Sequence, residues 1–138
     1  LEVESARRCA RAAGPADVER LRRQAERIDA LMSENRPEES RALEWGFHEA
    51  VAEIAGCPII REEIERSLVV LLTRMEFDPA KASRHVPIVD AIATGDPEAA
   101  ERAMRRHCEG AATQFAETKS GRQEAVRALE SISGSVMT

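Results

Sequence analysis

Proline and glycine divide this chain into helix-forming segments, and that punctuation constrains its fold more than any other feature. The stretches between them are rich in Ala, Arg, Glu, Leu and Ile, residues that favour helices over strands. Interruptions at Gly14-Pro15, at residues 35–37 and at residues 56–58 predict helices over residues 1–13, 15–34 and 38–55. The sequence therefore predicts an all-α fold.

The second half of the chain follows the same rule. We predict helices over residues 59–76, 79–94 and 97–119, and a last stretch at 122–131 that is either a short helix or a frayed tail. Asp96 should cap the sixth helix, with Pro97 as its first residue. A length of 138 residues suits one domain, which we expect to span residues 1–138.

Composition excludes several classes of protein. A net charge of −5 and only four aromatic residues argue against direct contact with DNA or single-stranded nucleic acid. The longest apolar run, residues 68–72, is too short to cross a bilayer, so no membrane association is expected. Cys9, Cys57 and Cys108 are scattered, as expected for reduced thiols in a cytoplasmic protein.

The three histidines all fall on apolar faces of the predicted helices. Glu44 and His48 are one turn apart, along the edge of one apolar stripe. The residues of that stripe are Leu43, Phe47, Val51 and Ile54. Glu44 and His48 could therefore both reach a metal at the edge of the core.

The other two histidines, His85 and His107, are equidistant from Asp96. In an antiparallel hairpin, residues equidistant from the turn face each other at one level. The predicted neighbours of His85 are Ile88, Val89 and Ile92, and those of His107 are Ala100, Ala103, Met104 and Ala111. A further helix packed on this hairpin would complete a cluster of one Glu and three His.

Such a cluster suits Zn, Ni, Mn or Fe better than Mg or Ca, which prefer oxygen ligands. Any single inward histidine is more often a hydrogen-bonded core residue, and a Glu–His pair one turn apart is common on helices. The metal interpretation rests on all three histidines lying inward, with two of them symmetric about a turn. Both interpretations stay open from the pattern alone.

Three motifs in the chain resemble those of a known family. Glu44-Trp-Gly-Phe-His48 is similar to its acid-x-x-Phe-His motif, and residues 85–96 to its His-x-x-Ile-x-x-Ala-Ile-x-x-Gly-Asp motif. Residues 100–107 are similar to its Ala-x-x-x-Met-x-x-His motif. The family is the FCD domain, the effector-sensing domain of FadR-type regulators within the GntR family of transcription regulators.

The resemblance implies an antiparallel bundle of six or seven helices that binds a small organic acid, often at a divalent metal. The ligands carried over are Glu44, His48, His85 and His107. Two residues depart from the family: Glu44 replaces the usual Asp, and Cys57 replaces an Asn. The resemblance also implies a homodimer and a winged helix-turn-helix ahead of Leu1, through which the protein would bind DNA.

Arginines are candidate clamps for the effector's carboxylate, because guanidinium binds carboxylate with two hydrogen bonds. Arg8 is the candidate we select, since the family tends to place an apolar residue there, although Glu4 one turn earlier is an alternative partner. The other arginines considered are Arg7, Arg11, Arg84, Arg105 and Arg106. Pro87 should kink the fifth helix or begin it.

Two other functions use the same residues. A small metallohydrolase or oxygenase would need a general base that is not a metal ligand. The acids nearest the histidines, Glu49, Asp90 and Glu109, point away from them on the helical wheel. We therefore expect a sensor rather than an enzyme; a metal-free helical interaction module is the third interpretation.

Overall fold

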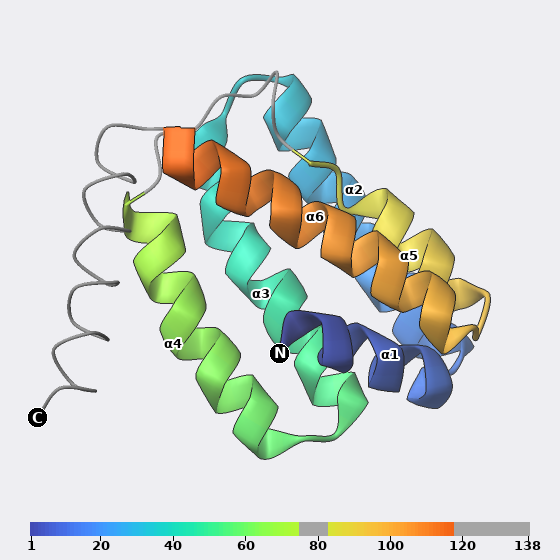
Figure 1. The fold of residues 1–138 in the computed structure, drawn as a ribbon. Helices are drawn as coiled ribbons and strands as arrows, with labels where there is room; N and C mark the ends of the chain where they lie inside the picture. The colour runs from blue at the N-terminus through green and yellow to red at the C-terminus, as the bar shows by residue number, and fades with distance from the viewer. Residues whose placement is uncertain (75–82, 118–138) are drawn as a thin grey trace, which may run out of the picture.

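A computed structural model of the protein describes residues 1–74 and 83–117, which form six α-helices and contain no strand (Figure 1). The helices are α1 (Glu2–Ala12), α2 (Pro15–Ser33), α3 (Pro37–Ala55), α4 (Pro58–Arg74), α5 (Val86–Ala93) and α6 (Pro97–Glu117). The all-α prediction is confirmed. No helix in the described ranges has the length and apolar character required to cross a membrane.

Helix α3 lies at the centre of the packing, against α1, α2 and α4. Helix α6 packs against α1 and α5, and α5 also packs against α2. In Figure 1, α6 runs across the front of the molecule, and the beginning of α1 lies beside α3. The packing of α1 on α6 thus joins the two ends of the described chain.

Proline begins four of the helices, at Pro15, Pro37, Pro58 and Pro97. Proline suits a first helical position because the amide that it lacks would have no partner within the helix. The predicted starts at residues 38 and 59 were late by one residue for this reason. The predicted cap is confirmed, since the Asp96 carboxylate accepts the Glu98 backbone N–H at 3.0 Å.

The main core joins α1, α2, α3, α5 and α6. Its largest buried side chains include Leu21, Ile28, Phe47, Ile92 and Met104. Leu43 corrects our prediction, because it is 42% exposed instead of buried in the stripe of α3. Helical periodicity identifies which face is apolar, but it does not say how far along the helix other elements cover that face.

The start of α5 is a second correction. We predicted a helix from residue 79, whereas residues 83–85 are not helical and His85 is the N-cap of a helix that begins at Val86. Pro87 explains this start. A proline ring clashes with the carbonyl of the residue four positions earlier, and proline has no backbone N–H to donate to that carbonyl. The prediction that Pro87 would kink or begin the helix is confirmed as a beginning.

Some predictions fall outside the described residues. These are the end of the fourth helix after residue 74, the fifth-helix residues before 83, the end of the sixth helix after residue 117, the segment 122–131 and the side chain of Ala111.

Candidate metal centre

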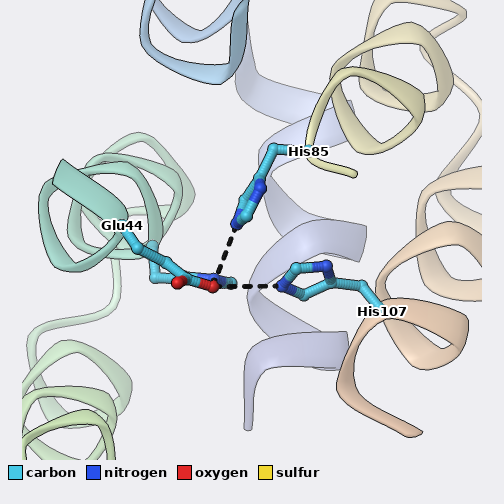
Figure 2. A group of neighbouring side chains, drawn as sticks. Glu44, His85 and His107 are labelled. Atoms are coloured by element: carbon cyan, nitrogen blue, oxygen red, sulfur yellow. Dashed lines mark hydrogen bonds and ion pairs between the residues drawn. The ribbon is translucent and has the colours of Figure 1, made fainter. Parts of the chain in front are cut away.

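Four predicted site residues meet between α3, α5 and α6. Glu44 and His48 come from α3, His85 from the residue just before α5, and His107 from α6. Figure 2 shows Glu44, His85 and His107 pointing toward one another from these three elements. The structure therefore brings together all four residues that the sequence singled out.

A single oxygen atom, Oε1 of Glu44, lies next to all three imidazoles. It is 3.1 Å from Nε2 of His85, 3.7 Å from Nε2 of His107 and 3.9 Å from Nε2 of His48. The same nitrogen of each ring thus faces the centre of the cluster. This shared orientation leaves the three Nδ1 atoms on the outside.

The rings pack closely in the core. The centroids of His85 and His107 are 4.5 Å apart, which confirms that these residues face each other across the hairpin. The ring of Phe47 is nearly perpendicular to those of His48 and His85, with centroids 5.4 and 5.2 Å away. The three histidines are at most 5% exposed, so the protein shields the cluster from bulk water.

The geometry fits a transition metal. One ligand atom from each of the four residues lies within 4.8 Å of the other three. Metal bonds of about 2.0–2.2 Å to nitrogen and oxygen allow two ligand atoms to lie up to roughly 4.4 Å apart. The four ligand atoms therefore lie close to the separations that one ion allows.

Burial and hydrogen bonds act in opposite directions on the charges of Glu44 and His85. Burial raises the pKa of Glu44, but the interactions of its carboxylate with His48 and His85 outweigh it and hold that pKa far below its usual value. Burial lowers the pKa of His85, but its bonds to Asp29 and Glu44 raise it to about 9. In the absence of a metal, the His85 imidazole therefore carries protons on both nitrogens at neutral pH and pairs, as a cation, with the Glu44 carboxylate.

His107 behaves differently from His85. Burial, followed by the positive charge of His85, lowers the pKa of His107 to about 3. Its imidazole is neutral at pH 7, which is the form that ligates a metal. The centre thus holds one imidazole that must lose a proton on metal binding and one that is already neutral.

Asp29 of α2, which also contacts the cluster, was not predicted from the sequence. Its carboxylate accepts the backbone N–H groups of His85 and Val86 at 2.8 and 3.0 Å, and it lies 3.2 Å from Nδ1 of His85. It therefore caps α5 and fixes the His85 ring so that Nε2 faces Glu44. The one sequence signal was its position beside the apolar stripe of α2, four residues after the buried Ala25.

Glu2 was also missed. One of its oxygens lies 3.7 Å from Nδ1 of His48, and the other accepts the thiol of Cys108 at 2.9 Å. Burial, reinforced by the Glu2 charge, raises the pKa of Cys108 far above its usual value, so the thiol keeps its proton for this bond. Cys9, Cys57 and Cys108 are all free, as predicted.

Two of the arginines considered as clamps, Arg8 and Arg84, have protein partners. Arg8 is exposed and donates to Glu4 at 2.9 Å, which is the alternative partner that the sequence indicated. Arg84 donates to the Asp29 carbonyl and to Ser33, both at 2.8 Å. The role of Arg8 in effector binding stays a prediction.

Replacing Asp29 by Ala should loosen α5 and the His85 ring together. Loss of a helix cap typically costs about 0.5–2 kcal/mol, and here two backbone donors and an imidazole lose one acceptor. We expect a lower urea midpoint and faster hydrogen exchange at the His85 and Val86 amides. Asp90→Ala is the control, because Asp90 is an exposed acid whose ion pair with Arg22 should contribute little. Equal effects of the two substitutions would contradict this role for Asp29.

The comparisons with known proteins identify a family. Neither the search of curated proteins nor the search of solved structures returned a match. A model of the FCD domain family matches residues 1–110, which include all four clustered residues and most of the 138-residue chain. The chain therefore belongs to the FCD domain family.

Proposed function

We propose that this chain is the effector-sensing domain of a GntR-type transcription regulator of the FadR branch. It would bind a small organic acid at a divalent metal held by Glu44, His48, His85 and His107. The observation that carries the proposal is the convergence of three buried imidazole nitrogens on one carboxylate oxygen. Its place in an FCD domain, a class of regulatory ligand-binding domains, supports sensing as the purpose of the site.

Three nitrogen ligands and one carboxylate favour Zn, Ni, Mn or Fe over Mg or Ca. A bound ion of this kind supplies a Lewis acid to which the carboxylate of an organic acid can coordinate. Side chains of this chain position the ligands. Asp29 orients His85, and Phe47 packs against the rings of His48 and His85. Glu44 supplies the negative charge that balances the centre.

The partners follow from charge and family. A net charge of −5 disfavours direct binding to DNA, so we assign DNA contact to another module of the regulator. Homodimerisation would let the bound effector alter the spacing of two such modules. These partners are part of the proposal.

Sensing is preferred over catalysis because four of the acids around the cluster have other partners and Glu109 is exposed. Glu49 and Asp90 each bind an arginine at 2.8 Å on the surface. The Asp29 carboxylate accepts backbone N–H groups from His85 and Val86, and Glu2 accepts the Cys108 thiol. None of these four carboxylates is placed as a free general base beside the centre.

Metal binding should require Glu44. We expect purified wild-type protein to hold about one equivalent of a divalent transition metal by elemental analysis, and Glu44→Gln and His107→Ala to bind it at least about tenfold more weakly. Glu49→Gln is the matched control, because Glu49 lies on the same helix and pairs with Arg61. If wild-type protein holds no metal, and Zn²⁺, Ni²⁺ and Mn²⁺ leave its melting temperature unchanged, the metal centre is wrong and the metal-free module is favoured.

Metal affinity should rise with pH. A metal must displace the Nε2 proton of His85, whose pKa is about 9. Raising the pH removes that competing proton, so the dissociation constant should fall by roughly tenfold per pH unit from pH 7 to 9 and then level off. Competition with a chelator of known affinity measures this slope. A constant affinity over that range would show that no proton leaves His85 on binding.

Effector binding should occur without turnover. A panel of small mono-, di- and hydroxy-carboxylic acids should contain members that raise the melting temperature of the metal-loaded protein and leave metal-free protein unchanged. Chromatography of the acids after incubation tests for reaction. Consumption of any acid by wild-type protein, but not by Glu44→Gln, would replace the sensor with a metalloenzyme.

A further inference from the structure

The outward-facing Nδ1 atoms of the three histidines have three different environments. Nδ1 of His85 lies 3.2 Å from Asp29, within reach of a hydrogen bond. Nδ1 of His48 and Nδ1 of His107 are buried and have no hydrogen-bond partner. Buried polar atoms are nearly always paired, so each of these two nitrogens requires an explanation.

Glu2 is the residue placed to pair with His48. Its Oε1 lies 3.7 Å from Nδ1 of His48, which is too long for a hydrogen bond and too short for an intervening water molecule. The glutamate itself is mostly buried, at 21% side-chain exposure, and its second oxygen is held by Cys108. A movement of less than about 1 Å would bring Oε1 within bonding distance of Nδ1.

We infer that Glu2 is a positioning residue for His48 and that it couples occupancy of the metal centre to the first turn of α1. The inference rests on the proposed metal site. When Nε2 of His48 is committed to a metal, the remaining ring proton is on Nδ1, and that N–H becomes a better donor. Glu2 then closes the 3.7 Å gap and accepts it, as Asp29 already does for His85.

Glu2 transmits this closure because it is the first residue of α1. The backbone N–H of Ser5 bonds to the Leu1 carbonyl at 2.9 Å, so movement of the glutamate acts on the first hydrogen bond of that helix. Figure 1 shows the beginning of α1 beside α3, the helix that carries His48. By linkage, a partner that displaces this turn would weaken metal binding, and the metal would weaken binding of that partner by the same factor.

Nuclear magnetic resonance of the Zn²⁺-loaded full chain tests the inference, since Zn²⁺ is diamagnetic. In wild-type protein, the Nδ1–H proton of His48 should be protected from solvent exchange, and Zn²⁺ should slow exchange of the Ser5 amide. Glu2→Ala should abolish both effects and weaken Zn²⁺ binding by about tenfold. Glu2→Gln keeps an acceptor oxygen of the same reach and should restore part of the protection.

Glu4→Ala is the matched control. Glu4 is in the same turn and carries the same charge, but it is exposed and pairs with Arg8. Its removal should leave the exchange rates of the His48 Nδ1–H and the Ser5 amide, and the Zn²⁺ affinity, within about twofold of wild type. The Nδ1–H of His85 is an internal reference, because its partner Asp29 is intact in every variant.

The outcomes separate this inference from the proposed function. If wild-type protein binds Zn²⁺ and Glu2→Ala retains the protected His48 proton and the affinity, the role of Glu2 is wrong and the metal centre stands. If Glu2→Ala, Glu2→Gln and Glu4→Ala all weaken binding equally, the effect is loss of charge in α1, which also refutes positioning by Glu2. If wild-type protein binds no Zn²⁺, both proposals fail.

Discussion

The site depends on one buried carboxylate oxygen shared by three imidazoles. An isolated buried carboxylate or imidazolium is costly, and each of these groups is tolerated in the core because the others compensate it. Oε1 of Glu44 provides that compensation at 3.1 to 3.9 Å from three ring nitrogens. Because the rings come from three separate elements, the relative positions of α3, α5 and α6 must be held within a fraction of an ångström.

Asp29 is what sets the position of α5. Pro87 has no backbone N–H, so the start of α5 presents the N–H groups of His85 and Val86. Asp29 accepts both, and the same carboxylate lies against the His85 ring. The proline that begins the helix and the aspartate that caps it therefore act together, and the orientation of the His85 ring follows from satisfying a helix end.

The four clustered residues could be predicted from sequence because two regular rules place them. Helical spacing puts Glu44 above His48, and the hairpin about Asp96 puts His85 opposite His107, as their 4.5 Å ring separation confirms. Asp29 and Glu2 obey no such rule. Asp29 contacts His85, which is 56 residues away in the sequence, and Glu2 contacts Cys108, which is 106 residues away. Such contacts depend on how the helices pack and not on the local sequence pattern. The exposed Leu43 shows the same limit for the core.

The three imidazoles differ in the hydrogen bonds that hold them, and this difference bears on the proposed sensing. A relay requires part of the site to stay fixed while another part has two arrangements. His85 belongs to the fixed part, since Asp29 holds its ring and its backbone. His107 has a neutral ring with no partner on Nδ1, and it projects from α6, which packs against both α1 and α5. Under the proposed function, an effector that changes how the centre is filled would act through α6 and α1, while α2 and α5 stay in place.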